Sequence, residues 1–67
     1  MIHVTLNGEV QALPPGLDVA GLIGHLGLDV RKVAIERNLA IVPRSAYQAT
    51  PLTEGDRIEI VAFIGGG

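Results

Sequence analysis

Cysteine is absent from this 67-residue sequence, and long apolar runs and clusters of basic residues are missing as well. Without cysteine the chain forms no disulfide, no thiolate metal site and no cysteine nucleophile, a pattern typical of a reducing compartment. Its apolar runs of a few residues fall far short of the roughly 20 that span a bilayer. The N-terminal segment lacks the basic region and apolar core of an export signal. The sequence therefore predicts a soluble, cytoplasmic protein with no membrane partner.

Charged residues are few and mixed in sign. Five Lys or Arg stand against seven Asp or Glu, a formal net charge of −2, and no basic block could neutralise nucleic-acid phosphates. His3 and His25 lie on different expected elements, without a second ligand at metal-binding spacing. Ser45, Thr50 and Thr53 have no base placed beside them by a motif. We therefore expect no nucleic-acid partner, no metal site and no catalytic residue.

The length limits the chain to a single domain. A chain of 67 residues buries only about 60% of the surface that its unfolded form exposes, so its stability margin is narrow. We expect one domain over residues 1–64 and a flexible glycine tail over residues 65–67. This division leaves no second domain to supply an active site.

The N-terminal segment alternates between apolar and polar residues, as a half-buried strand does. Asn7-Gly8 follows the first alternating run and supplies two residues that readily take the positive φ of a type I′ turn. Residues 9–13 return with the same alternation, which predicts a β-hairpin. Pro14-Pro15-Gly16 cannot continue a paired strand, because proline lacks the N–H that the pairing needs.

A helix is predicted after the hairpin. Asp18 can accept a hydrogen bond from the first helical turn, and Gly27 is a typical stop. Between them, four apolar residues fall on one side at helical spacing: Val19, Leu22, Ile23 and Leu26.

The second half of the chain reads mainly as strands. Residues 33–37 and 39–42 are rich in β-branched and apolar residues, with a turn expected at Asn38. A short helical turn is possible around residues 45–49, and the final strand spans residues 57–63. The order predicts an α+β fold of the β-grasp type, with a mixed sheet of four to five strands wrapped around one helix.

The final strand has two sides that raise different expectations. Ile58, Ile60 and Ala62 lie on one side, and Val61 and Phe63 lie on the other. If the first side faces the helix, Val61 and Phe63 are exposed. Two interpretations then stay open: a loop such as residues 45–53 covers them, or they form a docking patch for a partner.

Three segments carry a family resemblance that covers essentially the whole chain. They are AIERNLAIVPRS (34–45), LTEGDRIEIV (52–61) and the closing Gly-Gly. Together they resemble the thiamine-biosynthesis sulfur carriers, the ThiS family of the ubiquitin-like β-grasp superfamily. A strand that runs into a terminal Gly-Gly is shared with other β-grasp carriers. The Ile-Val-Pro-Arg-Ser segment points to the thiamine branch over the molybdopterin-synthase small subunit.

The resemblance implies a carrier protein and not an enzyme. Similar proteins are adenylated on the C-terminal glycine by a ThiF-like adenylyltransferase, which consumes ATP, so the carrier itself binds no cofactor. A sulfur donor such as a cysteine desulfurase then supports conversion to a thiocarboxylate, which delivers sulfur to the thiazole synthase ThiG. In this sequence the acceptor would be Gly67, with Gly65 and Gly66 as the tail motif.

The chemistry of the last residues agrees with this role. A terminal carboxylate has an ordinary pKa of about 3.3–3.7, so at neutral pH it is a poor electrophile until its oxygen becomes a leaving group. Glycine places no side chain beside the reacting carbonyl. At about 3.3–3.6 Å per extended residue, residues 64–67 would reach roughly 13–14 Å beyond the sheet.

Alternatives remain at this point. A related carrier for molybdopterin or a ubiquitin-like modifier would keep the same tail, whereas a non-covalent interaction module would carry its glycines incidentally. Arg44 lies in the segment most typical of the family and could hold the tail carboxylate or an acidic partner surface. An arginine at this place could equally cap the end of a strand.

Overall fold

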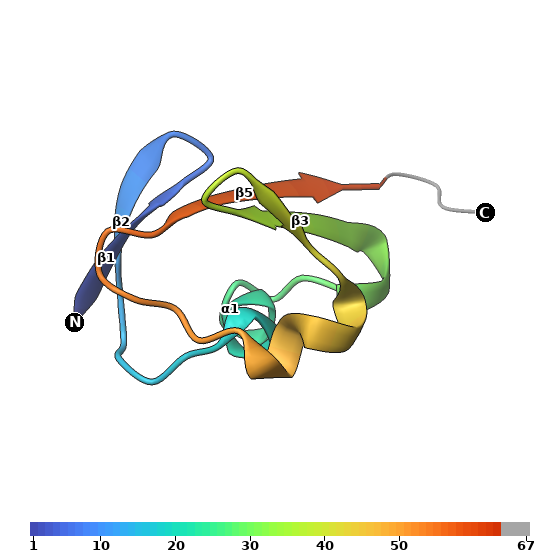
Figure 1. Ribbon diagram of the computed structural model, residues 1–67, viewed down its shortest axis with the longest axis horizontal. Helices are drawn as coiled ribbons and strands as arrows, with labels where there is room; N and C mark the ends of the chain where they lie inside the picture. Colours follow the sequence, from blue (N-terminus) through green and yellow to red (C-terminus); the bar gives the residue numbers. More distant parts are fainter. Residues whose placement is uncertain (64–67) are drawn as a thin grey trace.

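A computed structural model describes residues 1–63; the predicted acceptor Gly67 and the tail residues Gly65 and Gly66 lie outside the described residues. Figure 1 shows the order of the elements along the chain. They are β1 (Ile2–Leu6), β2 (Glu9–Leu13), α1 (Val19–His25), η1 (Val30–Lys32), β3 (Val33–Arg37), β4 (Ala40–Val42), η2 (Arg44–Ala49) and β5 (Arg57–Ala62), where η marks a 3₁₀ helix.

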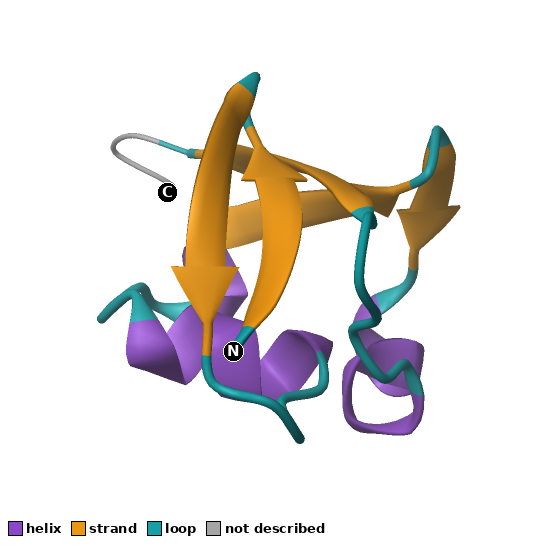
Figure 2. Cartoon of the chain, turned by 90° about the vertical axis from the view of Figure 1, so that its left-hand side faces the viewer, coloured by secondary structure: helices purple, strands orange, loops and turns teal. Residues whose placement is uncertain are grey.

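One mixed sheet forms the body of the domain, with strand order β2-β1-β5-β3-β4. β5 lies in the centre, parallel to β1 and antiparallel to β3. Figure 2 shows the helical segments gathered on one side of this sheet. The predicted β-grasp arrangement, a mixed sheet of four to five strands around one α-helix, is therefore confirmed, with five strands. None of the helices in residues 1–63 has the length and apolar character needed to cross a membrane.

Both hairpins turn on two residues with positive φ. In the first, Asn7 and Gly8 have φ of 48° and 84°, the conformation expected from the sequence. In the second, Asn38 has φ of 52° and Leu39 has φ of 72°. The expected strand at 39–42 therefore begins one residue later, at Ala40. The left-handed backbone of Leu39 was not predicted, because leucine rarely takes it.

The core lies between the sheet and the helical segments. Val19, Leu22 and Ile23 of α1 are buried, as predicted, whereas Leu26 at the C-cap is 36% exposed. The Asp18 side chain accepts a hydrogen bond from the Gly21 N–H at 2.7 Å and starts the helix. Other elements complete the core with apolar side chains: Val4, Leu13, Val33, Ile35, Val42, Tyr47, Leu52 and Ile58.

The short η1 turn was missed by the sequence analysis. Asp29 starts it by accepting a hydrogen bond from the Arg31 N–H at 2.9 Å. The turn matters because it places Arg31 and Lys32 immediately before β3, the strand that pairs with the end of β5.

Candidate functional site

The candidate site is built around β5, because this strand leads to the predicted acceptor. Its beginning is fixed by Asp56, which is only 4% exposed. Arg37 donates to the two Asp56 carboxylate oxygens at 2.9 and 3.2 Å. Asn38 Nδ2 donates at 3.1 Å, and the Thr53 N–H and hydroxyl donate at 2.8 and 3.1 Å. Burial by itself would raise the pKa of Asp56, but these hydrogen bonds outweigh it and lower the pKa.

This network was not predicted from the sequence. Asp56 is a buried carboxylate that joins the turn before β5 to β3. The three-residue separation of Thr53 and Asp56 is a local signal for a side-chain-bonded turn. No local signal pairs Asp56 with Arg37, which is 19 residues away.

The middle of β5 is held by Asn7. Its side-chain oxygen accepts from the Ile60 N–H at 2.7 Å, and its amide nitrogen donates to the Ile60 carbonyl at 3.1 Å. These two bonds continue the short parallel pairing of β1 and β5, whose last partners are Leu6 and Ile58. On the other edge, the Phe63 N–H donates to the Lys32 carbonyl at 2.7 Å. The strand is therefore anchored up to the last described residue.

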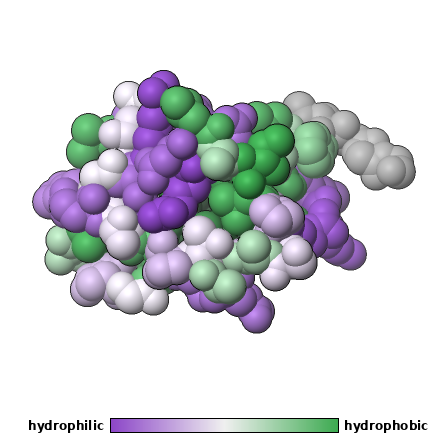
Figure 3. All heavy atoms as spheres, in the orientation of Figure 1, coloured by the Kyte–Doolittle hydropathy of each residue, from purple (hydrophilic) through white to green (hydrophobic). Residues whose placement is uncertain are grey.

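Apolar side chains lie exposed near this end of β5. Val61 is 57% exposed and Phe63 is 51% exposed, so the interpretation that a loop covers them is wrong. Val61 pairs with Ala34 on β3, and Ile41 on β4 is 78% exposed. Figure 3 shows hydrophobic side chains gathered beside the C-terminal end of the described chain. An exposed apolar strip of this kind is typical of a docking surface, and its role in docking stays a prediction.

Arg44 lies at the same end of the sheet, but on the helical side. It is the first residue of η2, and its Nη2 makes a long 3.4 Å hydrogen bond to the Arg31 carbonyl. The ion pairs of residues 1–63 involve Arg31, Arg37, Arg57 and His3, and none involves Arg44. The structure thus brings Arg44, Val61 and Phe63 to one end of the molecule but not to one face.

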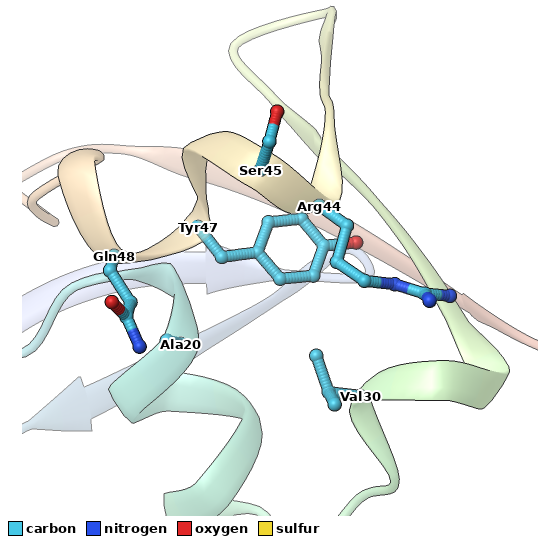
Figure 4. Close-up of a pocket in the computed structure, with 6 residues that line it drawn as sticks. All are labelled: Ala20, Val30, Arg44, Ser45, Tyr47 and Gln48. Atoms are coloured by element: carbon cyan, nitrogen blue, oxygen red, sulfur yellow. The ribbon is translucent and has the colours of Figure 1, made fainter.

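A pocket of about 340 Å³ opens beside Arg44. Figure 4 shows the six residues that line it: Ala20, Val30, Arg44, Ser45, Tyr47 and Gln48. The ring of Tyr47 lies behind the Arg44 side chain, and Ser45 points away from the other labelled side chains. Tyr47 was not singled out by the sequence analysis, because an isolated tyrosine in a segment without a clear period gives no sign of what it contacts.

These features first define a class of protein. A central strand is anchored on both edges, one α-helix packs on a mixed sheet, and the chain continues from β5 toward terminal glycines. A protein with these features is a small ubiquitin-like β-grasp protein. The model of the ThiS family matches residues 4–67, and the chain belongs to this family. The predicted resemblance is confirmed. Similar proteins include one named sulfur carrier protein and one named thiamine biosynthesis protein.

Several relatives have informative names. The chain is 52% identical over 66 residues to a protein named thiazole synthase from Paramagnetospirillum magneticum, covering 98% of this chain and 20% of that protein. A thiazole synthase from Magnetococcus marinus is 48% identical with the same coverage. The chain therefore spans about one fifth of the length of these two relatives. The sulfur carrier protein ThiS of Bacillus subtilis is 37% identical over 49 residues, which cover 73% of this chain and 74% of that protein.

The fold also matches a solved structure. The crystal structure of the thiamine biosynthesis protein ThiS from Geobacter metallireducens superposes with a TM-score of 0.84 at 30% identity. The match covers 98% of this chain and 100% of that one. Sequence and structure therefore agree on the family.

Proposed function

We propose that this chain carries sulfur as a thiocarboxylate on Gly67 and donates it for thiazole formation in thiamine biosynthesis. The observation that carries the proposal is the family match over residues 4–67, which runs through the terminal glycines. The anchored end of β5 supports it, because the Phe63 N–H bond to Lys32 fixes the point from which the last four residues continue.

The proposed chemistry begins with activation. A ThiF-like adenylyltransferase joins the Gly67 carboxylate to the AMP part of ATP and releases pyrophosphate. A sulfur nucleophile, supplied through a donor such as a cysteine desulfurase, attacks the carbonyl and displaces AMP. The product is an acyl disulfide between Gly67 and the donor cysteine; a second thiol attacks the donor sulfur, forms a disulfide with it and releases the thiocarboxylate. On a thiazole synthase, that sulfur is exchanged for a carbonyl oxygen of the thiazole precursor, and the oxygen regenerates the Gly67 carboxylate.

In this scheme the chain supplies the acyl group and the partner enzymes supply catalysis. The chain needs no cofactor of its own, since ATP is consumed by the activating partner. The relatives named thiazole synthase, which contain a region similar to this chain, favour a thiazole synthase as the sulfur acceptor. A reaction that draws on ATP and a desulfurase is expected in the cytoplasm.

Two surfaces at the end of β5 are proposed to meet the partner enzymes. The exposed Val61 and Phe63 side chains offer an apolar strip beside the tail. Arg44 offers a positive charge that no acidic side chain of residues 1–63 neutralises. Both lie near the start of the tail, so a partner could hold the domain and receive Gly67 at once.

The intact mass of the chain tests the proposal. We expect the full-length protein to gain about 16 Da, one sulfur in place of one oxygen, after incubation with the adenylyltransferase, ATP and a sulfur source. A variant that lacks Gly67 is the matched control and should gain nothing. No gain in the full-length chain, with an enzyme shown to be active on another carrier, would refute the function.

A further inference from the structure

The pocket beside Arg44 combines an aliphatic floor with polar groups on its wall. Ala20 from α1 and Val30 from η1 contribute apolar surface. Arg44 and Tyr47 come from η2, and Figure 4 shows the Tyr47 hydroxyl on the Arg44 side of the ring. No residue that lines the pocket is acidic.

Most hydrogen-bond donors of this pocket have no acceptor within residues 1–63. Tyr47 is only 4% exposed, yet its hydroxyl takes part in no hydrogen bond among these residues. Buried tyrosine hydroxyls usually have a partner. No side-chain nitrogen or oxygen of the described residues is both fully buried and without a partner, and Tyr47 lines the pocket.

The Arg44 guanidinium is similarly available. Its one hydrogen bond, to the Arg31 carbonyl, is long at 3.4 Å and leaves most of its N–H groups without a protein acceptor. Asp29, next to Val30 in the sequence, is paired with Arg31, which donates to both of its oxygens. Those bonds lower the pKa of Asp29 to about 2.

The pocket is also close to the start of the tail. Arg44 contacts the Arg31 carbonyl, and the Phe63 N–H binds the carbonyl of the next residue, Lys32. Consecutive carbonyls of η1 thus connect the pocket and the end of β5. The pocket and the last described residue, Phe63, therefore adjoin the same 3₁₀ turn.

We propose that the pocket is a docking site for an aspartate or glutamate side chain of the enzyme that activates Gly67. The carboxylate would accept hydrogen bonds from the Arg44 guanidinium and the Tyr47 hydroxyl, and its CH₂ groups would pack on Ala20 and Val30. This inference rests on the proposed function, which requires a partner enzyme to hold the domain while it acts on Gly67.

Charge complementarity and size favour this occupant. Arginine binds carboxylates in a bidentate geometry, and the pocket presents donors with no acidic lining residue to repel an anion. A volume of about 340 Å³ is at the lower end of small-molecule sites. It accommodates one or two side chains of a partner surface, with the exposed Lys32 at the same end adding positive charge.

Binding without ATP tests the docking separately from the chemistry. The full chain would be titrated with the ThiF-type adenylyltransferase of the same genome, comparing the wild type with Arg44→Gln and Tyr47→Phe. We expect the dissociation constant to rise about tenfold for Arg44→Gln and about threefold for Tyr47→Phe. Arg57→Gln is the matched control, since it removes the same charge at the other end of β5 and should bind normally.

Further readouts separate docking from a structural role. Arg44→Gln should raise the KM for adenylation and leave kcat unchanged, and Arg44→Lys should restore part of the affinity because the charge remains. Equal effects of Arg44→Gln and Arg57→Gln, or no measurable binding by the wild type, would overturn the proposal. Loss of affinity through unfolding is recognised from the thermal transition of each variant.

A small-molecule occupant is tested in the same set of experiments. Amide chemical shifts would be followed while inorganic phosphate or glutarate is added to the full chain. Saturating shifts at Val30 and Tyr47 below about 1 mM anion would assign the pocket to a free ligand and reject the docking role. If Arg44→Gln weakens binding while the wild type gains no mass, the docking stands and the sulfur-carrier function fails.

Discussion

The charged side chains at the two ends of β5 differ in whether they have partners of opposite charge. Where the strand begins, the buried Asp56 is paired with Arg37 and accepts further hydrogen bonds from Asn38 and Thr53. Where it ends, Arg44 has no acidic partner within residues 1–63, and Val61 is exposed. The first end is closed and internally satisfied, whereas the second is open and offers unused contacts.

This difference indicates that the first end of β5 stabilises the fold and the second is available for binding. A 67-residue domain has a small core, so a buried network at one end adds needed order to the fold. The exposed side chains of Val61 and Phe63 at the other end remain available to partners.

The substitution Asp56→Asn should destabilise the fold at the closed end of β5. We expect the free energy of unfolding to fall by about 3 kcal/mol, because Arg37 loses its buried partner and Thr53 loses a charged acceptor. Urea denaturation measures the change. Glu59→Gln, which removes a half-buried partner of the exposed Arg57, is the control and should move the midpoint less. Equal losses in the two variants would show that the network does not stabilise the fold.

Low pH should lower the stability of the fold by protonating Asp56 at the same end. The pKa of Asp56 is lowered in the folded state, so the unfolded chain takes up the proton first as the pH falls. Stability should be constant above the ordinary aspartate pKa of about 3.9 and decrease as the pH falls below it. Denaturant midpoints between neutral pH and pH 3 measure this. The fall should be shallower in Asp56→Asn; an identical slope would assign the acid sensitivity to other carboxylates.

The turn beside the closed end offers a stabilising change. Leu39 has φ of 72° and a side chain that is 74% exposed, so Leu39→Gly removes backbone strain and little buried surface. We expect a gain of about 0.5–1 kcal/mol after the added flexibility of glycine in the unfolded chain is included. Thermal and urea unfolding would both show it. A loss of stability would mean that the Leu39 side chain contributes packing that its exposure does not suggest.

The open end should tolerate a change in its apolar strip. Val61→Thr keeps the β-branched shape on a 57% exposed position, so stability should change by no more than about 0.5 kcal/mol. Binding to the activating enzyme or to thiazole synthase should weaken, as measured by calorimetry. Ala34→Ser, on the neighbouring strand opposite Val61, extends the test to the same strip. Normal binding by both variants would exclude this strip as a docking surface.

Much of the fold was predictable because its signals are local. Asn7-Gly8 marks a hairpin turn, Asp18 marks a helix start, and alternation along β5 separates Ile58 from Val61. The family also followed from short segments of sequence. The predicted roles of Gly67 and of the docking residues remain predictions, because residues 64–67 lie outside the described chain and no partner is present.

The sequence by itself determined the order of the strands and of α1 and the absence of cysteine chemistry, since each depends on residue type and short spacing. Only the tertiary structure decided how distant residues meet. Asp56 finds Arg37 across 19 positions, and Asn7 holds Ile60 across 53. Arg44 and Tyr47 form a pocket only because η2 packs against α1 and η1. Such contacts depend on packing between elements, which sequence spacing does not encode.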